Sequence, residues 1–290
     1  MKYAYYPGCS LQGTAREYDL SARAVCRALG IELKEIPDWN CCGASSAHAT
    51  NHLLALALPA RVLALAEREG LPEIAAPCAA CFNRLAVTTA RLNHDRVARQ
   101  RINNLIEMEY QGTGRVKSMV DVVIADYGLE ALRGKVRKPL AGLRVAAYYG
   151  CLLVRPAEVT RFDDPENPQK MERLVEALGG EPVDWSHKVE CCGMSLSVSR
   201  TDIAVRLVNE ILRAARAGGA DCLMVACPLC QANLDLRQPD AEREYRAKYN
   251  LPVYYFTQLT GVALGLDTAA LGLHTHIVDP LPLLRSKKLA

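Results

Sequence analysis

The hydrophobic pattern of the first half of the chain alternates between short apolar runs and longer stretches of helical period. Between the runs, apolar residues recur every three or four positions, which predicts amphipathic helices. The runs are typical of short buried strands and lie at 3–6, 31–36, 73–76 and 115–119. Strands that alternate with helices predict βαβ units and therefore a parallel sheet.

The second half repeats this pattern. Its apolar runs lie at 143–148, 182–185, 222–226 and 252–256. The predicted fold is therefore α/β, with two duplicated domains, each a small parallel sheet flanked by helices, related by pseudo-two-fold symmetry. We expect an N-terminal domain at 1–138 and a C-terminal domain with a tail at 139–290.

Helix boundaries are predicted from capping and turn residues. Thr14 and Glu17 have the spacing of a capping box, and Gly30 is expected to end the helix that they begin. In the second half, Asn167-Pro168 is expected to cap and open a helix. A polar helical stretch is expected over 83–110.

Ten of the twelve cysteines repeat together with the two halves. Each copy contains a single cysteine, then a Cys-Cys-Gly sequence, then a Cys-x-x-Cys sequence. The two sets are Cys9, Cys41, Cys42, Cys78 and Cys81, and Cys151, Cys191, Cys192, Cys227 and Cys230. The other two, Cys26 and Cys222, occupy core positions of a predicted helix and strand, where a cysteine is a small buried apolar residue.

The sets follow predicted strands, because Cys9, Cys78, Cys151 and Cys227 each come directly after one. Ligands of parallel α/β sheets bind beyond the carboxyl ends of the strands. Each half should therefore present its cysteines on one rim, and a two-fold pairing of the halves could bring the two rims together.

Composition narrows the class of protein. A chain of 290 residues that is 50% apolar can bury a core without disulfide staples. A formal charge of +3 is too slight to indicate a nucleic-acid partner. The start has no apolar leader, and the apolar stretch 53–66, interrupted by Pro59 and Arg61, is too short to span a bilayer and is expected to be core. We expect a cytoplasmic protein without a membrane span.

Three chemistries compete for the cysteine sets. Disulfides would need an oxidising compartment and a strained bridge between neighbouring cysteines. Structural zinc takes four ligands, whereas each half offers five. Iron–sulfur clusters are the favoured interpretation. A fifth thiolate must then be idle, bridge two irons or indicate a cluster of unusual shape, and the last is favoured because neighbouring side chains of a Cys-Cys pair point apart. Gly43 and Gly193 would let the backbone turn N–H groups toward sulfur.

The repeated cysteine pattern resembles that of the CCG-domain family, and a chain with two copies and little else resembles the B subunit of heterodisulfide reductase. The resemblance implies a noncubane [4Fe-4S] cluster in each half, one held by Cys9, Cys41, Cys42, Cys78 and Cys81 and the other by Cys151, Cys191, Cys192, Cys227 and Cys230. It also implies that a small disulfide is reduced to two thiols between the clusters.

Such a reduction takes two electrons and two protons. The chain has no ferredoxin-type cysteine run and no Gly-rich dinucleotide fingerprint, so electrons must come from a partner. The resemblance implies two partner chains of a heterodisulfide reductase complex, one ferredoxin-like and one flavin-containing, fed by a hydrogenase or formate dehydrogenase. His48 is the candidate proton donor, with His52 and His187 as weaker candidates.

Two other functions remain open. The chain could be a CCG-type electron-transfer subunit that links a soluble donor to a quinone or another acceptor. It could also be a zinc-bound structural scaffold, which would be colourless, whereas an iron–sulfur protein would be brown.

Overall fold

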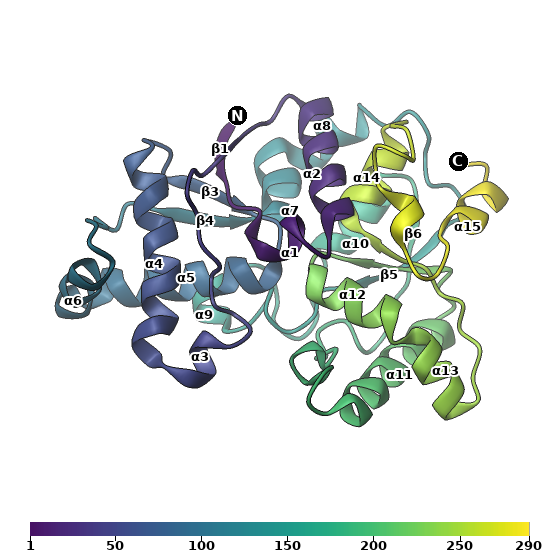
Figure 1. Cartoon of the computed structure of the whole chain (residues 1–290). Helices are drawn as coiled ribbons and strands as arrows, with labels where there is room; N and C mark the ends of the chain where they lie inside the picture. The colour runs from purple at the N-terminus through teal and green to yellow at the C-terminus, as the bar shows by residue number, and fades with distance from the viewer. Residues whose placement is uncertain (290) are drawn as a thin grey trace.

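The computed structural model describes residues 1–289 and contains two α/β halves that lie side by side (Figure 1). The elements of the first half are β1 (Lys2–Tyr5), α1 (Gly8–Gln12), α2 (Arg16–Leu29), β2 (Glu32–Glu35), α3 (Ala47–Thr50), α4 (His52–Arg68), β3 (Glu73–Ala76), α5 (Ala79–His94), α6 (Arg96–Ile106), β4 (Arg115–Ser118), α7 (Met119–Asp121), the π-helix η1 (Val122–Gly128) and α8 (Leu129–Arg133).

The second half begins at β5 and has the same succession of strands. Its elements are β5 (Arg144–Tyr148), α9 (Ala157–Thr160), α10 (Lys170–Ala177), β6 (Glu181–Pro182), η2 (Met194–Leu196), α11 (Thr201–Ala217), β7 (Cys222–Val225), α12 (Pro228–Leu236), α13 (Gln238–Tyr245), β8 (Val253–Tyr255), α14 (Phe256–Ala263), η3 (Leu273–Thr275) and α15 (Leu281–Ser286).

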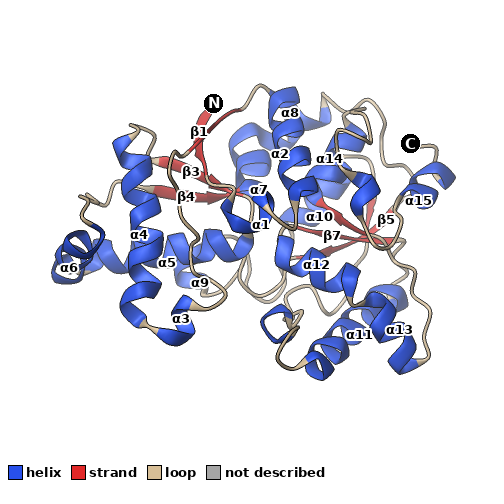
Figure 2. Cartoon of the chain, viewed as in Figure 1, coloured by secondary structure: helices blue, strands red, loops and turns tan. Residues whose placement is uncertain are grey.

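Each half contains one four-stranded sheet, and every strand pair in both sheets is parallel. The orders are β2-β1-β3-β4 and β6-β5-β7-β8, so corresponding strands occupy corresponding places. Helices surround both sheets (Figure 2). The predicted duplicated α/β fold is confirmed.

The inner strands of each sheet form its core. All four residues of β7 are buried, and so are Ile74, Ala75 and Ala76 of β3. Strands covered on both faces by helices are continuous apolar runs, which is why these segments could be predicted from the sequence. The edge strands β2 and β6 are short and partly exposed.

Two predicted helix starts were wrong. Helix α2 begins at Arg16 without a side-chain cap, because Glu17 is buried and accepts a hydrogen bond from the Tyr255 hydroxyl of the other half. Helix α10 begins at Lys170, two residues after Asn167-Pro168, and Asp163 accepts the hydrogen bond of the Lys170 N–H. In both places a side chain outside the predicted capping residues forms the hydrogen bond that decides the helix start.

The predicted polar helix over 83–110 is two helices. Helix α5 ends at His94, and Asp95 caps α6 by accepting the Ala98 N–H at 2.9 Å. By contrast, Gly30 ends α2 in the left-handed conformation, as predicted.

The halves pack through reciprocal helix pairs. The second helix after the first strand of each half contacts a helix that follows the last strand of the other, so α2 contacts α14 and α10 contacts α8. Likewise α1 contacts α12, and α9 contacts α5. Figure 1 shows α1 and α2 in the middle of the molecule, beside the elements of the second half. The exchange of equivalent helices makes the interface pseudo-symmetric.

Helix α4 is the most apolar long helix of the first half. Its C-terminal half is core, with Val62, Leu63 and Leu65 fully buried, whereas several residues of its N-terminal half are partly exposed. Within residues 1–289, every helix is too short or too polar to cross a membrane.

Candidate metal centre

The first cysteine set gathers at the carboxyl end of the first sheet. Cys9 lies in α1 directly after β1, Cys41 and Cys42 lie in the loop after β2, and Cys78 and Cys81 flank the start of α5 after β3. The sulfurs meet in pairs, with Cys9 Sγ 3.6 Å from Cys41 Sγ and Cys42 Sγ 3.3 Å from Cys81 Sγ. The topology therefore assembles five thiols from three separate strand ends.

The second set has the corresponding arrangement. Cys192 Sγ lies 3.6 Å from Cys230 Sγ, and Cys151 and Cys191 lie near enough to shift each other's pKa, upward for Cys151 and downward for Cys191. Cys151 and Cys227 follow β5 and β7, as Cys9 and Cys78 follow β1 and β3. All of these cysteines are free thiols in the structure.

A glycine next to the first cysteine of each set makes room for a sulfur of the Cys-x-x-Cys sequence. Gly8 and Gly150 both have positive φ angles, of 71° and 65°. A Cβ atom on Gly8 would lie 3.0 Å from Cys81 Sγ, and one on Gly150 would lie 3.1 Å from Cys230 Sγ. These positions need glycine for conformation and for space. The sequence signal was available, since both glycines directly precede a repeated cysteine.

The glycine of each Cys-Cys-Gly sequence donates its backbone N–H to sulfur. The Gly43 N–H points to Cys41 Sγ at 3.4 Å, and the Gly193 N–H points to Cys191 Sγ at 3.3 Å. Both glycines have positive φ angles. The predicted role of these glycines is confirmed, and such donors stabilise negative charge on sulfur.

A buried tyrosine in each half fixes the Cys-Cys loop. The Tyr6 hydroxyl donates to the Asn40 carbonyl at 2.8 Å, and the Tyr148 hydroxyl donates to the Glu190 carbonyl at 2.6 Å. Each accepting carbonyl belongs to the residue directly before the cysteine pair. This role of the tyrosines was not predicted from the sequence, although both lie three residues before a repeated cysteine.

The two cysteine sets meet between the halves. The thiols of Cys78 and Cys227 lie near enough across the boundary to shift each other's pKa, upward for Cys78 and downward for Cys227. The Tyr18 hydroxyl donates to the Pro77 carbonyl at 3.0 Å and lies 3.4 Å from the Ala226 carbonyl, so it bridges the residues directly before these two cysteines. The predicted meeting of the two rims is confirmed.

Contacts between the sulfurs shift their pKa values in opposite directions. Contacts with the Cys41 and Cys81 sulfurs lower the pKa of Cys42 to about 3. The neighbouring Cys230 and Cys78 sulfurs lower the pKa of Cys227 well below its usual value. In each set these contacts favour the thiolate, the form of cysteine that binds metal.

The chemistry of the donor set suits an iron–sulfur group. Within residues 1–289, no group of three or more His, Cys, Asp or Glu side chains is arranged to hold one metal ion. The sulfurs instead lie in pairs supplied by three strand ends, with N–H donors directed at Cys41 and Cys191. Five soft thiol donors in each half suit iron–sulfur chemistry.

The remaining candidates lie outside the two sets. Cys26 and Cys222 are buried, as predicted, and Cys26 Sγ contacts Met119 Sδ at 3.8 Å. His48 is exposed on α3 and lines a surface pocket together with His52. His187 is half-buried, and its Nδ1 hydrogen-bonds with the neighbouring Ser186 hydroxyl at 2.7 Å.

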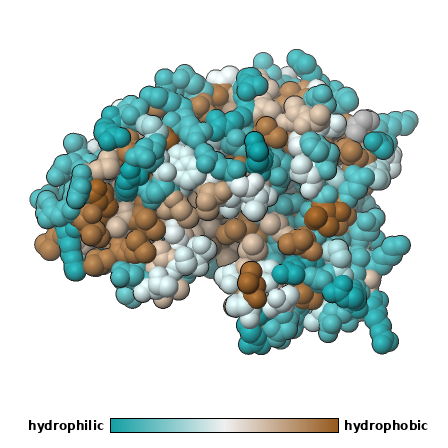
Figure 3. Space-filling model, viewed as in Figure 1, coloured by the Kyte–Doolittle hydropathy of each residue, from teal (hydrophilic) through white to brown (hydrophobic). Residues whose placement is uncertain are grey.

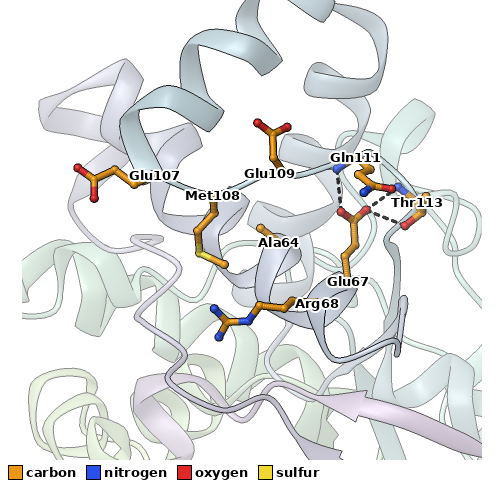
Figure 4. Close-up of a pocket in the computed structure, with 8 residues that line it drawn as sticks. All are labelled: Ala64, Glu67, Arg68, Glu107, Met108, Glu109, Gln111 and Thr113. Atoms are coloured by element: carbon orange, nitrogen blue, oxygen red, sulfur yellow. Dashed lines mark hydrogen bonds between the residues drawn. The ribbon is translucent and has the colours of Figure 1, made fainter.

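A pocket of about 430 Å³ lies beside α4, and no cysteine is among the residues that line it (Figure 4). The Glu67 carboxylate lies at its edge and accepts the backbone N–H groups of Gln111 at 2.7 Å and Thr113 at 2.6 Å. It thus holds the segment that leads from α6 to β4.

Comparison with known proteins identifies the domain type. The family model for the CCG cysteine-rich domain matches residues 3–86 and 145–235, and each match contains one five-cysteine set. The chain is 38% identical over 281 residues to the 8-methylmenaquinol:fumarate reductase membrane anchor subunit of Wolinella succinogenes, covering 96% of this chain and 97% of that one.

Other relatives have a different named role. The chain is 28% identical over 289 residues to the B subunit of a CoB-CoM heterodisulfide reductase of Methanosarcina acetivorans, covering 98% of this chain and 96% of that one. Among solved structures, a hypothetical protein from Helicobacter pylori superposes with a TM-score of 0.78 at 14% identity, covering 96% of this chain and 52% of that one. This chain thus spans about half of that protein, and the likeness supports the fold alone.

Proposed function

The chain belongs to the CCG cysteine-rich domain family, and we propose that it is the iron–sulfur subunit of a heterodisulfide reductase-like complex. In this proposal Cys9, Cys41, Cys42, Cys78 and Cys81 hold one noncubane [4Fe-4S] cluster, and Cys151, Cys191, Cys192, Cys227 and Cys230 hold the other. The two matched domains and the relatives named as B subunits of heterodisulfide reductase support this assignment.

The observation that carries the proposal is the approach of the two cysteine sets across the halves, where the Tyr18 hydroxyl bridges the carbonyls directly before Cys78 and Cys227. A small disulfide bound there has one sulfur beside each cysteine set. When bound, the two clusters supply one electron each. With two protons, these electrons convert R–S–S–R′ into the thiols RSH and R′SH.

The protein's own residues keep the meeting point ordered and dry. Tyr18 and Tyr255 are fully buried and stack at 4.1 Å between the halves. Burial raises the pKa of both far above the usual value for tyrosine, so both remain neutral phenols. We assign proton donation to His48, an exposed residue of α3 six positions after Cys42.

Electrons reach the chain from partner proteins of the same complex. We propose that one partner is ferredoxin-like and another contains a flavin, and that a hydrogenase or formate dehydrogenase supplies them with electrons. The relatives named as parts of heterodisulfide reductases support an assembly of several chains. We place this assembly in the cytoplasm.

An anaerobic titration tests the proposal. Protein purified without oxygen should contain iron and acid-labile sulfide in near-equal amounts, and its visible spectrum should change when the reduced protein is mixed with small disulfides. Thiol formation should match the electrons removed from the protein. Protein that contains zinc in place of iron, or reduced protein that no disulfide reoxidises, would refute it.

A second candidate is electron transfer from a quinol. The relative that is 38% identical is named for an enzyme that uses 8-methylmenaquinol, which favours a role between a quinol and a soluble acceptor. The same titration separates the two functions. A disulfide reductase is reoxidised by a disulfide, whereas the quinol-linked protein is reduced by a menaquinol analogue and is indifferent to disulfides.

A further inference from the structure

Equivalent positions beside the two cysteine sets carry different charges. The third residue after each Cys-x-x-Cys sequence is Arg84 in the first half and Asn233 in the second. The residue directly before each Cys-Cys pair is Asn40 in the first half and Glu190 in the second. At both positions the first half is therefore the more positive by one charge.

The third residue after the Cys-x-x-Cys sequence reaches the Cys-Cys pair in both halves. The Asn233 side-chain amide donates to the Cys192 carbonyl at 2.6 Å. In the first half, the neighbouring sulfurs of the set are the main cause that lowers the pKa of Cys42, and the charge of the Arg84 guanidinium contributes in the same direction. Arg84 therefore faces the buried cysteine of its pair and favours negative charge there.

The charge of Glu190 acts on the second set in the opposite direction. The neighbouring Cys151 sulfur lowers the pKa of Cys191 to about 6, and the Glu190 carboxylate opposes this shift. Glu190 is exposed, so solvent weakens its influence without removing it.

The charge of Arg84 is not neutralised by an ion pair. Its guanidinium donates to the neutral Asn83 side chain at 2.9 Å, and no carboxylate within residues 1–289 lies within ion-pair distance of it. Two cations beside the second set are, by contrast, paired with carboxylates, as Arg155–Glu166 at 2.8 Å and Lys188–Glu172 at 2.9 Å.

Arg84 also lies close to the boundary between the halves. Its neighbour Asn83 donates to the Leu152 carbonyl of the second half at 3.0 Å. Helix α5 runs from this boundary to α6 at the outer edge (Figure 1), with Arg84 in its second turn. Figure 3 shows mainly apolar and weakly polar residues in the middle of the same view. A charge in such surroundings is screened less than one that is fully in solvent.

We propose that Arg84 makes the cluster of the first cysteine set the more easily reduced of the two. Reduction transfers one electron from the partner protein to that cluster, and thus adds one negative charge beside the guanidinium. The positive charge stabilises this reduced state, whereas Glu190 destabilises the corresponding state of the second set. The first electron is therefore held in the first half. The inference rests on the two proposed clusters but not on the disulfide reaction.

A redox titration of the whole protein tests the proposal. Protein purified without oxygen is reduced stepwise with dithionite and followed by electron paramagnetic resonance and visible absorption, which should show two one-electron steps at different potentials. Arg84→Gln should lower the higher potential and leave the lower one unchanged. The equilibrium constant for that step should fall about threefold to tenfold, which is about 30–60 mV.

Three further variants separate charge from other effects. Arg84→Lys keeps the charge and should retain most of the higher potential. Arg91→Gln is the matched control on the same helix, because Arg91 lies in the last turn of α5 and pairs with Asp95 at 3.3 Å. It should leave both potentials unchanged. Glu190→Gln should raise the lower potential alone, by less than the Arg84 shift because Glu190 is exposed.

The inference is refuted if iron-loaded protein has two equal potentials, if Arg84→Gln leaves the higher potential unchanged, or if Arg84→Lys or Arg91→Gln lowers it as much. Should Arg84→Gln lose its iron, Glu190→Gln decides, and an unchanged lower potential would refute the inference. These outcomes leave the proposed function standing, since no disulfide takes part in the titration. Protein without iron would refute both.

Discussion

At the scale of single residues, the cysteines could be predicted from spacing, but the residues that fit around them could not. Gly8 and Gly150 are needed because a sulfur from a distant helix occupies the space of a Cβ atom. That sulfur is 73 positions further along the chain for Gly8 and Cys81, and sequence patterns report neighbours on one element rather than contacts between elements.

Gly8→Ala should therefore disturb the first cysteine set specifically. The new Cβ meets Cys81 Sγ at 3.0 Å in a backbone of positive φ. Because one of two proposed clusters loses a properly placed ligand, anaerobic protein should contain about half the iron of the unaltered protein. Iron and acid-labile sulfide assays measure this.

Gly30→Ala is the control for Gly8→Ala, because it introduces the same backbone strain without displacing a sulfur atom. Gly30 has the same φ of 71°, but nothing lies within 4 Å of the added Cβ. It should lower the free energy of unfolding by about 1 kcal/mol through backbone strain and leave the iron content unchanged. Equal loss of iron in both variants would contradict the proposed role of Gly8.

Cysteine substitutions test the ligand sets themselves. Cys81→Ala removes a proposed ligand and should lower iron to about half, since the second set is untouched. Cys26→Ala is the control, because Cys26 is buried against Met119 and outside both sets. Retention of all iron by Cys81→Ala, or equal loss by Cys26→Ala, would show that the ligand set is assigned incorrectly.

At the scale of elements, strands were predicted more reliably than helix ends. Inner strands such as β3 and β7 are buried on both faces, so they are apolar at nearly every position and leave a clear signal. Helix starts depend on which partner each polar side chain finds. Glu17 binds Tyr255 of the other half rather than capping α2, and no local pattern contains that information.

A buried ion pair in the second half fixes the loop before Cys191. The sequence pattern did not predict this pair. Lys188 Nζ lies 2.9 Å from Glu172 Oε1 of α10, and the side chains are only 4% and 7% exposed. The Lys188 carbonyl also accepts the N–H groups of Tyr149 and Gly150, next to Cys151. The pair thus connects a helix to two of the cysteine-bearing segments.

Lys188→Met should destabilise the protein strongly, because it leaves the buried Glu172 carboxylate without a cation and with only the neutral Tyr149 hydroxyl as a partner. The expected loss is about 3–5 kcal/mol in the free energy of unfolding, measured by urea denaturation. Lys2→Met breaks an exposed pair with Glu32 of similar length, 2.8 Å, and should cost less than about 1 kcal/mol. If both variants lost the same small amount, the Lys188 pair would contribute no more than a surface contact.

At the scale of the whole molecule, the repeat predicted two similar halves but not how they join. The pairing rests on side chains such as Ser21 and Thr257, whose hydroxyls lie 2.7 Å apart across the interface. These residues belong to helices that look like ordinary amphipathic helices in the sequence. The resulting exchange of equivalent helices brings the two cysteine rims together.

We expect Tyr18 to set the distance between the two cysteine sets. Its hydroxyl contacts the carbonyls of the residues directly before Cys78 and Cys227. Tyr18→Phe should cost about 1–3 kcal/mol, since a buried carbonyl loses its donor. It should also change the magnetic interaction between the two proposed clusters, measured by electron paramagnetic resonance. Tyr254→Phe removes a similar buried bond, to the Pro280 carbonyl at 2.7 Å, away from the boundary. It should cost as much stability without altering the resonance, and identical spectra for the two variants would show that Tyr18 does not set the spacing.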